Sequence, residues 1–192
     1  MSAALPDIIA PGLAVLFCGI NPGLLAASTG HHFAGRSNRF WPVLYRAGFT
    51  PSLFAAEEGE RLLEVDCGIT AVVRRPTAGA DELTSRDFAA AAAPFGAMLD
   101  EYRPRYLAFL GKAAYSALTG QRSIAWGRQA APMHGGIAWV LPNPSGRNLA
   151  FSFDALVEAY AALRAEAFAA PPSATLASPP SGARKADRPR GR

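Results

Sequence analysis

Cysteine and histidine are scarce in this sequence, which contains two cysteines and three histidines among its 192 residues. Cys18 ends an apolar run and Cys67 ends a predicted helix, so the pair does not form a disulfide framework. The adjacent His31 and His32 lack the spacing of metal ligands, because neighbouring side chains seldom converge on one ion. We therefore expect no metal site and a reducing, cytoplasmic environment.

Long hydrophobic runs are also missing. The apolar run over residues 13–18 is too short to span a bilayer, and the N-terminus lacks the basic region of a secretory signal. We expect a protein that has no membrane partner.

Most of the chain carries no excess charge. The formal net charge is +4, but residues 171–192 alone contain five basic residues and one acidic residue. Because the rest of the chain is neutral, the basic pI is no evidence that the folded domain binds nucleic acid. We expect one domain over residues 1–168 and a disordered, basic, Pro/Ser/Ala-rich tail over 169–192. The charge of this tail either attracts nucleic acid weakly or only keeps the tail solvated.

Apolar segments of strand length alternate with helical patterns along the chain. Strands are predicted over residues 13–18, 69–73, 105–110 and 137–141. Helices are predicted over residues 39–47, 53–66, 85–102 with a break or kink at Pro94, 112–119 and 153–168. Residues 24–37 are predicted as a long loop. This order predicts an α/β fold, a three-layer α/β/α sandwich with a central, mostly parallel four-stranded sheet.

Two similar turns follow the first and last predicted strands. The first is Gly19-Ile20-Asn21-Pro22-Gly23, and the second is Asn143-Pro144-Ser145-Gly146. Ligands of open α/β sheets bind at the carboxyl ends of the strands, where both turns would lie. Together the turns would offer two amides, a hydroxyl and free backbone N–H groups, but no carboxylate. Each is also compatible with an ordinary strand-to-loop turn.

Phe33 is the one large apolar side chain in the Gly- and His-rich stretch over residues 29–35. It is either an anchor that packs into the core or a stacking platform for a planar ligand.

The two turns, the loop that holds Phe33 and the segment Asn38-Arg39-Phe40-Trp41 resemble the mismatch-specific (G:T/U) uracil-DNA glycosylases. These enzymes form the thymine-DNA glycosylase-like branch of the uracil-DNA glycosylase superfamily. The similarity runs from about Ile8 to about Ala165 and implies a glycosylase domain within residues 1–168. It implies a monofunctional DNA repair glycosylase that needs no cofactor. We expect a monomer that is cytoplasmic and nucleoid-associated, as in bacteria.

The resemblance implies that the protein flips uracil, or a related damaged or mismatched pyrimidine, out of double-stranded DNA. It then hydrolyses the N-glycosidic bond and leaves an abasic site. Asn21 would position the attacking water. The resemblance implies substrate-binding roles for Ile20, Gly23, Phe33, Asn143 and Ser145, and DNA-binding roles for Gly146, Arg147 and Asn148. Because an amide orients water but cannot take its proton, we expect slow chemistry that needs a good leaving group.

This sequence departs from the family pattern at two places. Arg147 stands where related enzymes often carry a leucine that enters the DNA stack as a wedge. Arginine can fill that gap, pair with phosphate or stack on bases. His31 and His32, just before Phe33, are bulkier and more polar than the family pattern, and we expect them to alter which base substituents the pocket admits.

Asp87 has two interpretations. It is the fourth residue of Thr84-Ser85-Arg86-Asp87, which has the form of a helix capping box. It is also a candidate catalytic carboxylate. A site without a strong base would gain from a carboxylate that can reach the sugar through a single bridging water molecule.

Two functions of other classes remain open from the residues alone. One is a non-catalytic nucleotide-binding module in which residues 19–23 bind phosphate, although the segment lacks the lysine of a P-loop. The other is a hydrolase of free nucleosides or nucleotides.

Overall fold

A computed structural model describes residues 5–169 of the chain, so most of the predicted tail lies outside the described residues. At its centre is a five-stranded sheet in the order β2-β1-β3-β5-β4. The strands are β1 (Val15–Gly19), β2 (Cys67–Ala71), β3 (Tyr106–Leu110), β4 (Gly127–Arg128) and β5 (Ile137–Leu141). The first four in this order are parallel, and β4 pairs antiparallel with β5.

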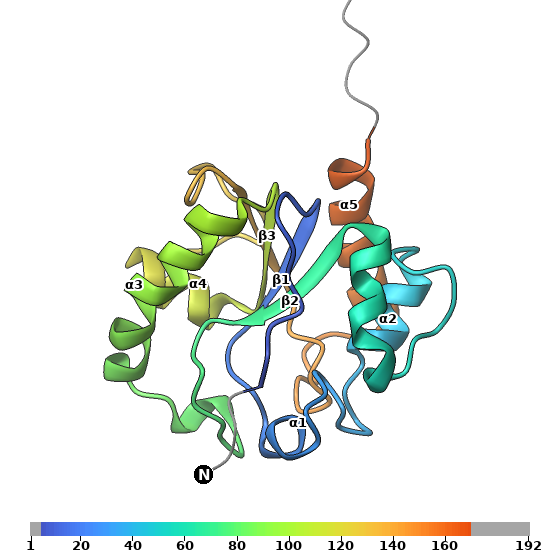
Figure 1. Ribbon diagram of the computed structural model, residues 1–192, viewed down its shortest axis with the longest axis horizontal. Helices are drawn as coiled ribbons and strands as arrows, with labels where there is room; N and C mark the ends of the chain where they lie inside the picture. The colour runs from blue at the N-terminus through green and yellow to red at the C-terminus, as the bar shows by residue number, and fades with distance from the viewer. Residues whose placement is uncertain (1–4, 170–192) are drawn as a thin grey trace, which may run out of the picture.

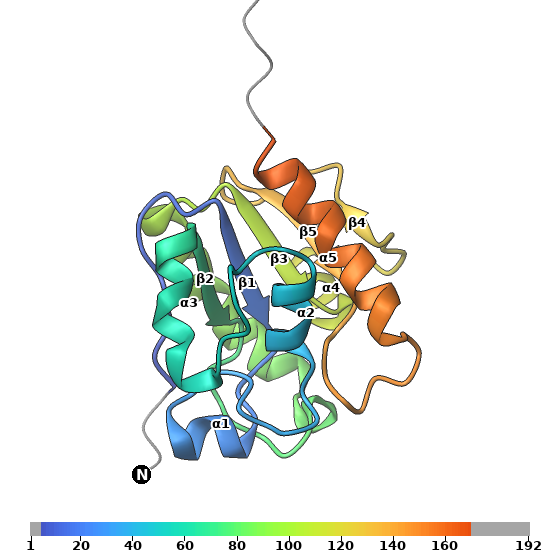
Figure 2. The same cartoon turned by 90° about the vertical axis from the view of Figure 1, so that its right-hand side faces the viewer.

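Helices cover both faces of the sheet (Figure 1). One face carries α3 (Ser85–Tyr102) and α4 (Lys112–Thr119). The other carries α2 (Phe40–Arg46), α5 (Phe153–Ala167) and the 3-10 helix η1 (Ala56–Val65). The short helix α1 (Leu24–Thr29) lies below the carboxyl ends of the strands, as Figure 2 shows, and the 3-10 turn η2 (Ala80–Glu82) follows β2. The predicted three-layer α/β/α sandwich is confirmed.

The strand β1 explains how the two faces are packed. All five of its residues are buried, as expected for a central parallel strand. Val15 and Phe17 belong to the core beneath α2 and α5, whereas Leu16 and Cys18 belong to the core beneath α3 and α4. Successive side chains of a strand point to opposite faces, so a continuous apolar run fills both cores.

The sheet contains one strand more than the sequence predicted. The additional strand β4 is only two residues long, and a glycine and an exposed arginine carry no apolar signal. The second predicted strand, 69–73, begins earlier, at Cys67, so this cysteine starts a strand instead of ending a helix.

Three helical predictions also need correction. The predicted loop 24–37 contains α1, and the predicted helix 53–66 is shorter and of the 3-10 type. The helix α3 runs unbroken through Pro94. Pro94 and Ala90, whose carbonyl loses its intrahelical partner, are both exposed, so water can satisfy that carbonyl.

Both cysteines are free and buried. Burial raises the pKa of the Cys67 thiol to about 12 and also raises that of Cys18. A thiol with a raised pKa is a poor nucleophile and a poor metal ligand at neutral pH. Of the helices within residues 5–169, none has the length and hydropathy needed to cross a membrane.

Candidate active site

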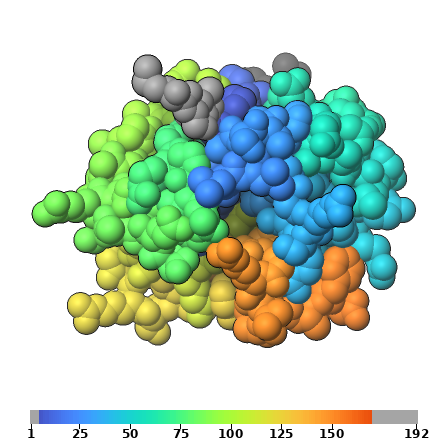
Figure 3. All heavy atoms as spheres, turned by 90° about the horizontal axis from the view of Figure 1, so that it is seen from below, coloured from blue at the N-terminus to red at the C-terminus, as the bar shows by residue number. Residues whose placement is uncertain are grey.

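A pocket of about 470 Å³ opens at the carboxyl edge of the sheet, between α1 and the segment that follows β5. Figure 3 looks onto this edge, with α1 in blue and the segment after β5 in orange. Both Asn-Pro turns line the pocket, although β3 separates their strands in the sheet. Of the residues singled out from the sequence for the site, all but His31, Asp87 and Gly146 line it.

The side chain of Asn21 is held by its amide nitrogen. Nδ2 donates to the hydroxyl of Thr77 at 2.7 Å, to the carbonyl of Arg75 at 2.9 Å and to that of Pro22 at 3.2 Å. Within residues 5–169, Oδ1 has no hydrogen-bond partner. The side chain therefore offers a fixed acceptor and no donor to whatever occupies the pocket.

Thr77 sets this orientation and was not identified from the sequence. Its side chain is buried, its N–H donates to the Pro22 carbonyl at 3.1 Å, and its hydroxyl donates to the Gly79 carbonyl at 2.8 Å. Because that hydroxyl proton is used, the oxygen can only accept from Asn21. No local pattern could have shown this, since the two residues are 56 positions apart.

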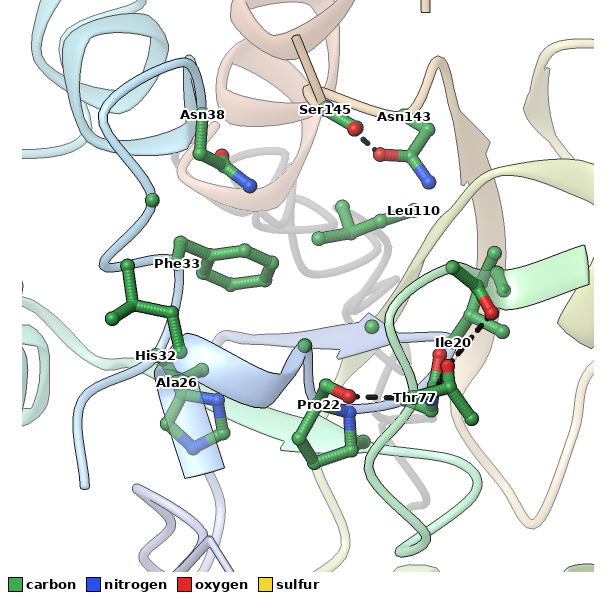
Figure 4. Close-up of a pocket in the computed structure, with 18 of the residues that line it drawn as sticks. Ile20, Pro22, Ala26, His32, Phe33, Asn38, Thr77, Leu110, Asn143 and Ser145 are labelled. Carbon is green, nitrogen blue, oxygen red and sulfur yellow. Dashed lines mark hydrogen bonds between the residues drawn. The ribbon is translucent and has the colours of Figure 1, made fainter. Parts of the chain in front are cut away.

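Asn143 presents the opposite end of its amide. Its Oδ1 accepts from the Ser145 N–H at 2.9 Å, and its backbone carbonyl accepts from Asn148 Nδ2 at 2.9 Å. Its own Nδ2 has no partner within residues 5–169 and points into the pocket (Figure 4). Asn38 shows the same arrangement, because its Oδ1 accepts from the Phe40 N–H at 3.0 Å while its Nδ2 faces the pocket.

Gly111 separates the two turns at the end of β3. A Cβ on it would contact Asn143 Cβ at 3.6 Å and Ile20 Cδ1 at 3.9 Å, and its φ is +111°. A side chain there would be strained and would press between Asn143 and Ile20.

Phe33 packs against the core and also lines the pocket. Its ring stacks on the buried Phe40, with centroids 4.1 Å apart and planes at 28°, and it also lines the pocket. Its φ of 57° is unusual for a bulky residue, and such conformations often occur at functional sites. One face of the ring therefore packs on the core, and the other is available to a planar ligand (Figure 4).

His32 lies in the wall of the pocket, whereas His31 is not among the lining residues. His32 is buried, and its Nε2 lies 2.8 Å from the Pro6 carbonyl. A carbonyl only accepts hydrogen bonds, so Nε2 carries the proton. Burial lowers the pKa of His32, which keeps the ring neutral near pH 7.

The segment after the second turn carries two further side chains of interest, those of Arg147 and Leu149. Arg147 lines the pocket and reaches Gly79, where a Cβ would lie 2.9 Å from Arg147 Nη1. Leu149 is 90% exposed, the highest value among the large hydrophobic side chains. Arg147 was expected at the wedge position from the sequence, whereas no sequence pattern pointed to Leu149.

Gly146 serves the packing of the loop. A Cβ at Gly146 would lie 2.4 Å from the Ser37 carbonyl oxygen, which no side chain could tolerate without moving the backbone. Gly146 does not line the pocket.

Asp87 caps α3, outside the pocket. It accepts from the Thr84 N–H at 2.8 Å and forms an ion pair with Arg75 at 2.8 Å. These hydrogen bonds hold the pKa of Asp87 far below its usual range, and the hydrogen bond from Arg75 has the largest effect. The carboxylate lines a separate pocket against β2 and α3. The one carboxylate that lines the Asn21 pocket belongs to Asp81, which the sequence analysis did not consider.

No group of three or more His, Cys, Asp or Glu side chains within residues 5–169 could hold a metal ion. The pocket is lined by amide and hydroxyl side chains, the Phe33 ring and backbone groups, together with the His32 imidazole, the Asp81 carboxylate and the Arg147 guanidinium.

Comparison with known proteins agrees with this geometry. The solution NMR structure of a candidate uracil DNA glycosylase from Methanosarcina acetivorans is similar in fold, with a TM-score of 0.59 and 21% sequence identity. The similarity covers 85% of this chain and 96% of that one. The family model for the uracil DNA glycosylase superfamily matches residues 6–164, which is most of the chain. The chain belongs to the uracil DNA glycosylase superfamily.

Proposed function

We propose that this protein is a monofunctional DNA glycosylase of the mismatch-specific, thymine-DNA glycosylase-like branch. It flips uracil, or a related damaged or mismatched pyrimidine, out of double-stranded DNA and hydrolyses the N-glycosidic bond. The observation that carries the proposal is the free Oδ1 of Asn21, a fixed acceptor in a pocket that also contains Phe33. We assign the activity to the domain over residues 1–168, acting as a monomer in the cytoplasm.

The attacking water would bind to Asn21 Oδ1. Because Thr77 and two carbonyls hold Nδ2, the amide cannot turn to present its donor, and the lone pairs of Oδ1 stay directed at the water. An amide does not remove the proton, so the water attacks only as the bond to the base breaks and positive charge develops on the sugar. The reaction then depends on a base that leaves readily as an anion.

The flipped base would stack on the free face of Phe33. Aromatic stacking of this kind contributes on the order of 1–3 kcal/mol per base. The Nδ2 donors of Asn143 and Asn38 face the same space and can bind oxygen atoms of the base or sugar. Donors already in place stabilise the negative charge of the departing base without rearranging during the reaction.

The duplex would meet the segment that carries Arg147 and Leu149. A base that leaves the stack opens a gap, and a side chain that fills this gap keeps the base from returning. Arg147 can reach phosphate or the gap, and the exposed Leu149 is an apolar side chain of suitable size on the same segment.

The test uses labelled duplexes with one uracil opposite guanine or adenine, the same strand alone, and free deoxyuridine. The protein is incubated with each substrate, and alkali then reveals abasic sites. We expect strand cleavage after alkali in duplexes with uracil and no hydrolysis of deoxyuridine. Binding without cleavage in any context would favour a nucleotide-binding module, and hydrolysis of deoxyuridine alone would favour a nucleoside hydrolase.

A further inference from the structure

Arg39 makes an unusual set of contacts beneath the segment that carries Arg147 and Leu149. Its guanidinium donates to the carbonyls of Asn148 at 2.8 Å, Phe151 at 2.9 Å, Ser145 at 3.1 Å and Pro144 at 3.4 Å. Its backbone N–H also donates to the Pro144 carbonyl, at 3.0 Å. One residue thus gathers the carbonyls on both sides of Arg147 and Leu149.

No carboxylate within residues 5–169 lies within ion-pair distance of this guanidinium. Arg39 is partly buried, and its charge is therefore met by backbone dipoles alone. A cation held in this way leaves net positive charge under the segment, which suits a surface that approaches phosphates.

Arg39 also joins the two walls of the pocket. It precedes Phe40, the ring on which Phe33 stacks, and its side chain reaches the wall that contains Asn143 and Ser145. Gly146 packs against Ser37 in the same region, so residues 37–39 support the segment through both backbone and side chain.

We propose that Arg39 is a positioning residue that fixes the DNA-facing conformation of residues 144–151. The proposal rests on the function proposed above and adds that duplex substrates depend on Arg39 far more than single strands do. A single strand has little stacking to interrupt, so it needs the pocket but not an ordered Arg147 and Leu149. Asn143 keeps an anchor outside this segment, because the Tyr160 hydroxyl donates to the carbonyl of the neighbouring Pro142.

The test compares Arg39→Met and Arg39→Lys with the control Arg46→Met, which alters an exposed arginine at the far end of the helix α2 that Arg39 precedes, outside the pocket. Single-turnover excision of uracil is measured on a duplex and on the same strand alone. Amide hydrogen exchange is measured over residues 145–150 in the free protein.

We expect Arg39→Met to slow duplex excision about tenfold and single-strand excision less than about threefold. Exchange over residues 145–150 should quicken about tenfold, with no change in Arg46→Met. Arg39→Lys should fall between, because an ammonium keeps the charge but cannot reach four carbonyls. If Arg39→Met does not fold, the same excision and exchange measurements on Arg39→Lys decide the proposal.

Unchanged exchange over residues 145–150, or an equal loss on duplex and single strand, would overturn the proposal. If the unaltered protein excises uracil from neither substrate, the proposed function fails. The exchange measurement then still decides whether Arg39 orders the segment.

Discussion

The two Asn-Pro turns are alike in sequence and opposite in what they present to the pocket. At the first turn the amide nitrogen of Asn21 is fully used and its oxygen is free. At the second turn the amide oxygen of Asn143 is used and its nitrogen is free. The same residue type thus leaves a free acceptor at one turn and a free donor at the other. The difference arises from the neighbours of each amide.

The partners of the two amides come from different distances along the chain. Asn143 is held by Ser145 and Asn148, which lie in its own turn. Asn21 is held mainly by Arg75 and Thr77, which follow β2 and lie more than 50 positions away. The second turn is therefore a self-contained unit, whereas the first depends on the pairing of β1 with β2.

The largest effect is expected at Asn21. Asn21→Ala should lower single-turnover excision by roughly two orders of magnitude or more, because the lost interaction acts in the transition state. DNA binding should change little, as measured by fluorescence anisotropy. Asn21→Asp should recover part of the rate, and recovery should grow with pH as the carboxylate ionises. Excision by Asn21→Ala at the rate of the unaltered protein would rule out the assignment.

At Asn143 we expect the Asp variant to excise more slowly than the Ala variant, which is the reverse of the order expected at Asn21. Asn143→Ala removes one donor and should slow excision roughly tenfold to a hundredfold. Asn143→Asp should be slower still, because its carboxylate can still accept from Ser145 N–H but repels the departing base. If Asp restores activity at both positions, the two amides do not play opposite roles.

Substitutions at Arg147 and Leu149, which follow the second turn, should impair action on duplex DNA more than action on single strands. Leu149→Ala should slow excision from a duplex about fivefold, because extrusion costs a few kcal/mol and the gap is left open. Arg147→Ala should flatten the salt dependence of duplex binding by about one phosphate contact. Both variants should act on single strands almost normally. A duplex defect confined to Arg147→Ala would return the wedge role to Arg147.

The smallest effect is expected at Asp87, whose partner Arg75 holds Asn21 through its backbone carbonyl. Asp87→Asn should leave excision within about twofold of the unaltered protein, since the backbone contact remains. The pKa of Asp87 is lowered in the folded state, so its ion pair stabilises the fold above the ordinary carboxyl pKa of about 3.9. That stability is lost as the pH falls through the lowered pKa.

The melting temperatures of the unaltered protein and of Asp87→Asn should therefore differ at pH 7 and converge in acid. A fall in excision of about tenfold at unchanged stability would instead make Asp87 catalytic.

Local pattern was sufficient for much of the fold. The run over residues 13–18 is apolar at every position and predicts a strand buried on both faces, and the strand β1 lies at Val15–Gly19 with all five residues buried. The strand β4 was missed because two residues without an apolar signal are held only by their pairing with β5. The helix α1 was missed because its glycine neighbours and short length resemble a loop.

The sequence by itself determined that two Asn-Pro turns end buried parallel strands, and hence that they meet at one edge of the sheet. Only the tertiary structure decided which atom of each amide is left free, because Thr77 and the Arg75 carbonyl reach Asn21 from the segment that follows β2. It also decided that Asp87 caps a helix away from the pocket and that Leu149 is exposed beside Arg147. Residue type fixes which hydrogen bonds a side chain can make, and contacts between distant segments fix which of them remain free.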